Sequence, residues 1–256
     1  MKTIKNIGNA IYSVYSLVVF FSLAVIALFL YLFIAWLPER KRLVAIFRIN
    51  SVWQATWCLL TGVRVKVLNP EGRDPSATYV FVANHSNMLD ILIAGGSIIH
   101  PYRPLAKKEL FYIPIMGWVL RFMCLGVDRK SIQNRRRSFQ NMIKKLEKGV
   151  SILIFPEGTR NRTSEPLKSF YDGAFRLSIE TGFPILPIVF LNARSLQPVD
   201  TIRLYPGKIF VKYLDPIDPV KEQIAETKAL KELAFSRMYA ELEVESAPEK
   251  AAAQTN

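Results

Sequence analysis

Histidine and cysteine are scarce in this sequence of 256 residues, which contains two of each. Cys58 and Cys124 lie far apart in apolar surroundings and form no CxxC pattern, so neither a disulfide framework nor a zinc site is expected. His85 and His100 belong to no HExxH pattern, and no glycine-rich loop of the Walker or dinucleotide type occurs. We therefore predict no metal site and no cofactor, and expect both cysteines to be buried as small hydrophobic side chains.

Acidic residues are also under-represented, because 21 Asp and Glu stand against 34 Lys and Arg and the formal net charge is +13. Such an excess favours a polyanionic partner, which could be nucleic acid, an anionic membrane surface or a phosphorylated substrate. Much of the excess lies in a basic segment, residues 131–148. We predict that it faces anionic lipid headgroups or the phosphates of coenzyme A, with a merely solvated helix face as an equal alternative. The residues concerned are Arg135, Arg136, Arg137, Lys144, Lys145 and Lys148.

Charge is absent from residues 11–37, an apolar run that would form about 40 Å of helix at 1.5 Å per residue. Four basic residues follow this run within residues 40–48, which predicts a membrane anchor with the rest of the chain on the cytoplasmic side. A cleaved signal peptide is disfavoured, because the sequence Trp-Leu-Pro-Glu-Arg follows instead of a small-residue cleavage site. A helix that lies in the membrane interface, or a re-entrant hairpin, remains an open alternative.

Beyond the anchor, strand and helix patterns alternate along the chain, which predicts an α/β fold with a mixed, largely parallel sheet flanked by helices and preceded by N-terminal membrane-associated helices. Strands are predicted at residues 63–68, 78–83, 151–155, 185–191 and 209–213. Helices are predicted at residues 43–60, 86–94, 131–148, 172–181 and 220–244.

Three regions are expected from this pattern. Residues 1–60 should form the membrane anchor and an amphipathic helix with two Trp on its apolar stripe, which is either interfacial or part of the core. Residues 61–244 should form one catalytic domain, since the chain is too short for two full domains to be the first expectation. Residues 245–256 are predicted to be a disordered tail.

The sequence Asn-His-Ser-Asn-Met-Leu-Asp at residues 84–90 follows an apolar strand, at the end where ligands bind in an open α/β sheet. A carboxylate on one imidazole nitrogen would leave the other nitrogen free to take a proton from a substrate hydroxyl. His85 and Asp90 can meet only if His85 lies in the turn before the helix, which the capping residues Asn84 and Ser86 favour. A buried histidine with an acid nearby by chance is the simpler alternative, so this pattern needs a second element.

The sequence Phe-Pro-Glu-Gly-Thr-Arg at residues 155–160 supplies that element, because it follows another buried strand. Gly158 allows a tight turn that exposes backbone amides, and Arg160 adds a guanidinium that matches phosphate geometry. Glu157 is an unusual neighbour for an anion site unless it contacts a hydroxyl or a cation. A base with its orienting acid, together with a phosphate socket, predicts transfer of a group onto a phosphorylated alcohol.

Together these patterns resemble the 1-acylglycerol-3-phosphate acyltransferases, a family of glycerolipid acyltransferases. The family has four ordered sequence blocks, and this chain holds sequences similar to all of them between residues 78 and 190. They lie at residues 84–90, 125–129, 155–160 and 183–189. The chain departs from the family at Ser86 and Asn87, where Gln and Ser are frequent, which bears on acceptor choice more than on chemistry.

The resemblance implies that His85 is the general base and Asp90 its partner, which together deprotonate the hydroxyl of a lysophospholipid. That oxygen would attack the thioester of an acyl-CoA or acyl-carrier protein directly, giving phosphatidic acid without an acyl-enzyme. Further site residues implied for the acceptor are Lys107, Arg129 and Arg160 at the phosphate and Glu157, Gly158 and Thr159 at the glycerol.

Several alternatives stay open. The same chemistry could serve another lysophospholipid, glycerol 3-phosphate or a lyso-aminolipid, although two arginines favour a phosphate. A non-enzymatic protein that binds anionic membrane lipids would explain the charge and the anchor, but gives no reason for the His85 and Asp90 pattern. We expect no nucleic-acid partner, and a location at the bacterial inner membrane with the catalytic domain on the cytoplasmic side.

Overall fold

The computed structural model of the chain describes residues 2–70, 74, 76–98, 100–128, 131–199 and 201–253, with side chains described between residues 6 and 244. Its centre is a seven-stranded sheet in the order β1-β7-β6-β2-β5-β3-β4. All neighbouring strands are parallel except β6 and β7, which confirms the mixed, largely parallel sheet. The strands are β1 (Val63–Leu68), β2 (Val80–Ala83), β3 (Tyr102–Lys107), β4 (Leu125–Val127), β5 (Ser151–Ile154), β6 (Ile185–Leu191) and β7 (Gly207–Tyr213).

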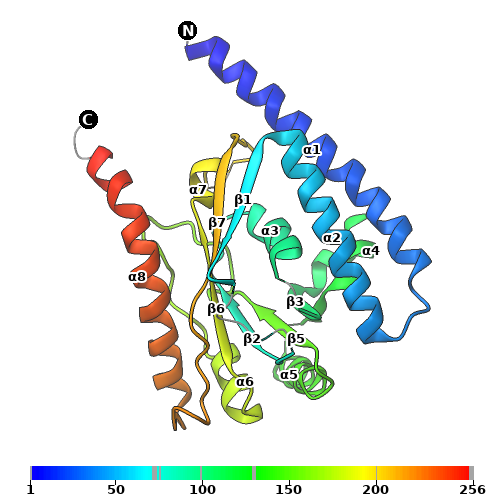
Figure 1. Ribbon diagram of the computed structural model, residues 1–256, viewed down its shortest axis with the longest axis vertical. Coiled ribbons are helices and arrows are strands. Elements are labelled where there is room, and N and C mark those ends of the chain that lie inside the picture. Colours follow the sequence, from blue (N-terminus) through cyan, green and yellow to red (C-terminus); the bar gives the residue numbers. More distant parts are fainter. Residues whose placement is uncertain are drawn as a thin grey trace.

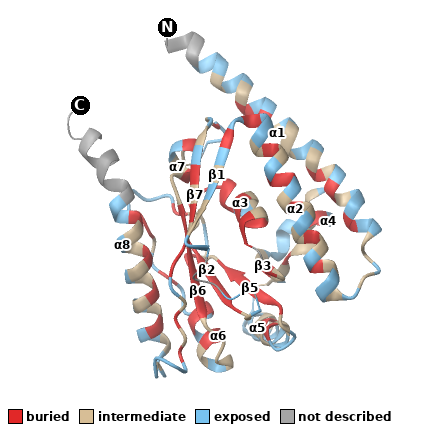
Figure 2. Cartoon of the chain, in the orientation of Figure 1, coloured by how far each residue is buried: buried red, intermediate tan, exposed pale blue. Residues whose placement is uncertain are grey.

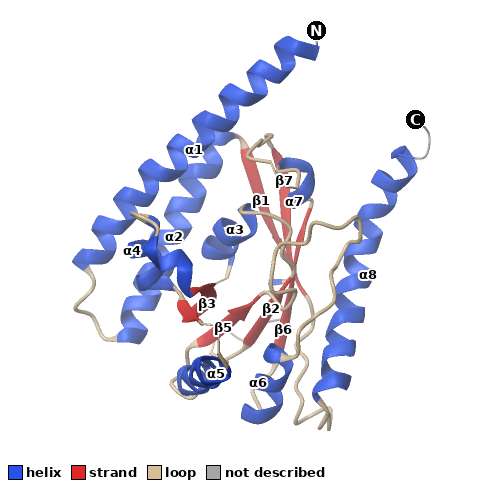
Figure 3. Cartoon of the chain, turned by 180° about the vertical axis from the view of Figure 1, so that it is seen from behind, coloured by secondary structure: helices blue, strands red, loops and turns tan. Residues whose placement is uncertain are grey.

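Helices cover both faces of this sheet, as Figure 1 and the reverse view in Figure 3 show. One face carries α1 (Lys2–Phe33), α2 (Glu39–Thr61), α3 (Leu89–Ser97) and α4 (Met116–Met123). The other carries α5 (Ile132–Leu146), α6 (Gly173–Thr181) and α8 (Thr227–Ala253). The short α7 (Ala193–Leu196) follows β6, and a 3-10 helix (Lys108–Tyr112) follows β3.

Strand β2 shows why the sheet is buried on both faces. Phe81 and Ala83 belong to the apolar core under α1 to α4, whereas Val80 and Val82 belong to the core under α5, α6 and α8. A central parallel strand therefore reads as a continuous apolar run instead of an alternating one. In Figure 2 this central region is buried, while the outward surface of α1 is mostly exposed.

The N-terminal helices α1 and α2 pack side by side against the domain (Figure 1). Near one end, Tyr12 donates to the Thr61 carbonyl at 2.5 Å, and the backbone amide of Leu204 donates to the Ser13 hydroxyl at 2.9 Å. Toward the other end, Tyr31 donates to the side chain of Asn50. Helix α1 is thus fastened along its length and does not stand apart from the fold.

Glu39, the first residue of α2, fixes the start of this helix to the sheet. It accepts from Arg103 on β3 at 3.1 Å and from Lys145 on α5 at 2.6 Å. The side chain of Arg103 is nearly buried, so it requires such an anionic partner. Further along, α2 passes so close to α3 that a Cβ on Gly96 would lie 1.7 Å from Gln54 Oε1. Glycine at this position therefore permits the close packing of the two helices.

Some expectations from the sequence need correction. The two Trp on the apolar stripe of α2, Trp53 and Trp57, are buried in the fold, which favours the core interpretation of that stripe. Cys124 is buried as predicted, but Cys58 is only partly buried. The helix expected from residue 220 begins at Thr227 and continues to Ala253, and the disorder expected after residue 244 stays a prediction.

Candidate active site

The described residues of the predicted site lie at one edge of the sheet because their strands are parallel neighbours. His85 follows β2, the Phe155 to Arg160 segment follows β5, and Lys107 ends β3, whose neighbour is β5. The carboxyl ends of parallel strands meet at the same edge, and loops there form the usual ligand site of an open α/β sheet.

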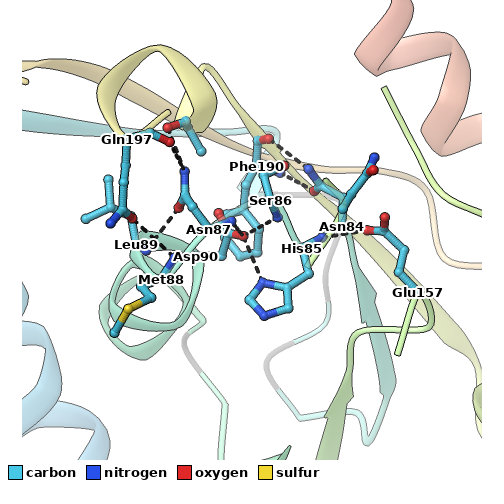
Figure 4. Close-up of polar contacts among 12 residues, drawn as sticks. Asn84, His85, Ser86, Asn87, Met88, Leu89, Asp90, Glu157, Phe190 and Gln197 are labelled. Carbon is cyan, nitrogen blue, oxygen red and sulfur yellow. Dashed lines mark hydrogen bonds and ion pairs between the residues drawn. The ribbon is translucent and has the colours of Figure 1, made fainter. Parts of the chain in front are cut away.

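The turn between β2 and α3, residues 84–90, holds the predicted base and its acid. Helix α3 begins at Leu89, three residues later than the sequence predicted, so His85 lies in the turn and not in the helix. Its Nδ1 is 3.0 Å from Asp90 Oδ2 (Figure 4), and the Asp90 side chain is fully buried. The same oxygen accepts the backbone amides of Ser86 at 2.6 Å and Asn87 at 2.9 Å. The predicted contact between His85 and Asp90 is therefore confirmed, and the carboxylate also holds the turn together.

Two neighbouring side chains, Asp90 and Phe155, hold the orientation of the His85 imidazole. Its ring stacks on Phe155 with centroids 4.4 Å apart and an interplanar angle of 28°. Figure 4 shows the second ring nitrogen turned away from Asp90. A carboxylate at Nδ1 favours the tautomer in which Nε2 carries a free lone pair, which is the form that a proton acceptor needs.

Asn84 keeps the start of this turn in register with the sheet. Its side-chain amide donates to the Phe190 carbonyl at 3.1 Å, and its oxygen accepts the Phe190 amide at 2.8 Å (Figure 4). The side chain thereby imitates a strand residue and continues the pairing between β2 and β6 beyond Ala83.

Glu157 is fully buried and connects three segments of the site. Its two carboxylate oxygens accept the backbone amides of His85 at 2.7 Å and Lys168 at 3.1 Å. Burial raises the pKa of Glu157 to about 7, although these two hydrogen bonds act in the opposite direction. The carboxylate that looked out of place beside an anion site is thus bound to backbone amides, and its predicted role at the acceptor glycerol stays a prediction.

The rest of the Phe155 to Arg160 segment forms a tight turn beside the base. Gly158 has a φ of 74°, and its amide donates to the Phe155 carbonyl at 3.0 Å. Immediately after the turn, the Asn161 amide donates to the His85 carbonyl at 2.7 Å, which joins the two predicted sequences directly. Residues 84–90 and residues 155–160 thus lie together in the candidate site.

The cations on this edge differ in their surroundings. Arg160 is partly exposed, Lys107 is exposed, and neither side chain has a hydrogen bond or ion pair within the described part of the chain. Lys168, which is not among the predicted site residues, lies 3.2 Å from the Thr159 hydroxyl and adds a cation to the same turn. Arg129 lies outside the described residues, so its role remains a prediction.

The basic helix α5 only partly matches its expected surface. Lys145 is paired with Glu39 instead of facing lipid or coenzyme A. The five others of the predicted set are exposed, namely Arg135, Arg136, Arg137, Lys144 and Lys148.

Comparison with known proteins adds independent information. The family described as acyltransferase matches residues 64–191. The 1-acyl-sn-glycerol-3-phosphate acyltransferase of Escherichia coli is 30% identical over 200 residues, which cover 75% of this chain and 80% of that protein. An uncharacterized acyltransferase of Schizosaccharomyces pombe is 34% identical over 169 residues, and the chain spans 59% of its length.

The fold also has a solved counterpart. The crystal structure of the 1-acyl-sn-glycerophosphate (LPA) acyltransferase PlsC from Thermotoga maritima superposes with a TM-score of 0.76 at 24% identity. The match covers 96% of this chain and 98% of that one. At this identity the likeness establishes the fold, including the two N-terminal helices.

Proposed function

Because the chain belongs to the acyltransferase family, we propose that it transfers an acyl chain from an acyl thioester to the sn-2 hydroxyl of 1-acylglycerol 3-phosphate. The donor is acyl-CoA or acyl-carrier protein, and the product is phosphatidic acid. The single observation that carries this proposal is the buried Asp90 carboxylate 3.0 Å from His85 Nδ1, directly beside the Phe155 to Arg160 turn.

This geometry supports the following reaction. His85 Nε2 takes the proton of the acceptor hydroxyl, and the oxygen attacks the thioester carbonyl carbon. The carbon–sulfur bond breaks, and the leaving thiolate takes the proton back from the imidazolium. Asp90 stabilises the transient positive charge on the ring without taking part in the proton transfer. The two substrates and His85 account for every bond and proton in this step, so we propose no cofactor.

The cationic side chains at this edge of the sheet suit the acceptor phosphate. Arg160 offers a planar fork for two phosphate oxygens, and Lys107 and Lys168 offer point charges from neighbouring loops. A phosphomonoester carries about 1.5 to 2 negative charges near neutral pH, so more than one cation is needed to offset it. Arg129 belongs to the same proposal by its resemblance to the family, as do Gly158 and Thr159 at the glycerol.

We also propose that the enzyme works at a membrane surface, on the cytoplasmic side. Two described helices are long and apolar enough to cross a bilayer, residues 6–33 and 39–61. Since α1 packs against α2 and against the Leu204 loop, a perpendicular crossing would carry part of the catalytic domain into the bilayer. The outward face of α1, which exposes Phe29 and Phe33, instead suits a helix pair that lies in one leaflet.

Other acceptors keep the same chemistry and remain the alternative. Another lysophospholipid or glycerol 3-phosphate would still use the cations, whereas a lyso-aminolipid would leave Arg160 without its anion. A protein that only binds anionic lipid would need no imidazole oriented by a buried carboxylate, so the contact between His85 and Asp90 argues against it.

The test is a product assay on the purified full-length protein in mixed micelles. A panel of lysophospholipids, glycerol 3-phosphate and lyso-aminolipids is offered with acyl-CoA and acyl-carrier protein, and products are identified by mass. We expect phosphatidic acid as the main product, and His85→Ala should lose turnover while keeping its binding to lipid vesicles. Turnover that survives in this variant would remove the mechanism, and a different main product would change the acceptor.

A further inference from the structure

The one-turn helix α7 contacts both turns of the site, although it lies outside every sequence block named above. It follows β6 and begins after Asn192, whose φ of 63° is in the left-handed region. That conformation turns the chain sharply off the sheet and toward the site, and it is uncommon for residues other than glycine.

The first contact joins α7 to residues 84–90, the turn that carries His85, which we call the base turn. Asn87 donates from its side-chain amide to the carbonyls of Ala193 at 2.7 Å and Gln197 at 3.1 Å. In return, the Met88 amide donates to Gln197 Oε1 at 3.2 Å (Figure 4). Asn87 and Gln197 are buried, so these bonds are shielded from water and hold the turn that carries His85.

The second contact joins α7 to the segment that follows residues 155–160, the turn that we call the anion turn. The guanidinium of Arg194 donates to three backbone carbonyls, those of Thr163 at 3.1 Å, Glu165 at 3.2 Å and Asn161 at 3.5 Å. Asn161 in turn donates its amide to the His85 carbonyl at 2.7 Å. The base turn, the segment after Arg160 and α7 therefore form a closed ring of hydrogen bonds.

From this ring we infer that α7 fixes the separation between the base and the phosphate socket, with Asn87 and Arg194 as positioning residues. The inference rests on the proposed function, because that separation must match the distance from the reacting hydroxyl to the phosphate. We expect this fixed spacing to favour acceptors with the hydroxyl on the carbon next to the phosphate-bearing carbon. Acceptors with the hydroxyl one carbon further away should react more slowly.

A serine at position 87 would be too short to reach the carbonyls of both Ala193 and Gln197. Asn87→Ser should therefore release the base turn from α7 while removing no group that touches the substrate. Arg194→Gln should release the other turn in the same way. Displacements of about 1 Å in such positioning contacts can cost on the order of 100-fold in rate.

The experiment measures kcat and KM for two acceptors that cannot interconvert, 1-O-alkyl and 2-O-alkyl glycerol 3-phosphate. Each single variant should lower the preference for the 1-O-alkyl isomer by about 3-fold or more, and each should change both kcat and KM. The double variant should lose less than the product of the two single effects, since both break the same ring. Arg203→Gln, an exposed arginine without a described partner, serves as the matched control.

Unchanged isomer preference in both single variants, with multiplicative losses in the double variant, would overturn the inference. A second measurement does not depend on turnover. Hydrogen–deuterium exchange at the imidazole C2 position should change at His85 in Arg194→Gln, although Arg194 does not touch His85, and stay constant at His100. Constant exchange at His85 would also overturn the inference, whereas wild-type protein inactive on both isomers would count against the proposed function instead.

Discussion

The two turns at the carboxyl edge of the sheet are built in opposite ways. In the base turn, Asp90 collects the imidazole and two backbone amides, so the negative charge is compensated by the protein itself. Around the anion turn, Arg160 and Lys107 keep their charges without a described partner. Under the proposed function, the charge of Asp90 needs no further partner, whereas the two cations remain available for a substrate anion.

This contrast fits the roles proposed for the two turns. A proton acceptor works best when its orientation and tautomer are fixed before the substrate arrives, because reorganisation then adds nothing to the barrier. A binding socket works best when its cations have no internal anion to displace. Glu157 belongs to the turn with the cations, but its two oxygens accept backbone amides, so it leaves the cations available.

The largest effect is expected from Asp90→Asn, which tests whether the base turn depends on charge or only on shape. An asparagine can keep its oxygen on His85, Ser86 and Asn87, and its amide group would replace Oδ1, which has no described partner. The turn should therefore stay folded while the imidazolium loses its counter-charge. We expect kcat to fall by about 100-fold to 10,000-fold at nearly constant acceptor KM, measured by steady-state kinetics.

Thermal unfolding of the same variant separates charge from shape, because a melting point close to wild type would show that the turn is intact. A kcat within about five-fold of wild type would mean that the carboxylate only supports the fold.

A smaller effect is expected from Arg160→Gln, which tests the open side of the comparison. Removing one charge-assisted contact of about 1.5 to 3 kcal/mol should raise KM for the phosphorylated acceptor by about 10-fold to 150-fold, with a smaller change in kcat. Monoacylglycerol, which has no phosphate, should be affected little. Steady-state kinetics on both acceptors checks this selectivity.

Arg203→Gln is the matched control, since it removes the same charge from an exposed position without a described partner. Equal losses in the two variants, or equal losses on the two acceptors, would show that Arg160 contributes general positive potential instead of a specific phosphate contact.

The smallest effect is expected from Glu157→Gln, which tests the buried carboxylate that links the two turns. Because burial raises the pKa of Glu157 from 4.5 to about 7, the folded protein binds more protons than the unfolded chain between these values. The contribution of Glu157 to stability is thus fully present below about pH 4.5 and is lost as the pH rises through about 7. The variant should lose this dependence, since glutamine does not titrate.

Glutamine also faces one backbone amide with its own N–H groups, which costs about 1 to 3 kcal/mol. The variant should therefore be less stable than wild type at pH 5, and the gap should shrink by pH 8, as measured by thermal unfolding at both values. Glu226→Gln, at an exposed glutamate, should leave the wild-type slope in place. A gap that widens toward pH 8 would mean that the carboxylate is stabilised as an anion.

Sequence predicted the parts of the fold whose signals are local. The strands β2, β5 and β6 are continuous apolar runs, and His85 and Asp90 are five residues apart in one turn. Strand β3 was missed because it contains Arg103 and Pro104, and the arginine is tolerated there through Glu39, 64 residues away. Strand β4 was missed because three residues are too few to show a period.

The same limit applies to the site. The two sequence strings could be recognised separately, but Asn87 reaches carbonyls more than 100 residues away, and nothing near α7 in the sequence signals that contact. Lys168 was likewise hidden, because its place beside Thr159 depends on how the chain after the turn is held by Glu157. Contacts of this kind are decided by packing in three dimensions.

The link from Glu39 to Arg103 and Lys145 has a consequence for how the enzyme would sense its surroundings. Glu39 holds the start of α2 to β3 and α5, and α1 is hydrogen-bonded to α2, so the helix pair is tied to the sheet. If lipid holds the outer face of α1 as proposed, these contacts would also set the distance between His85 and the headgroups. That distance would then limit which acceptors can bring their hydroxyl to the ring.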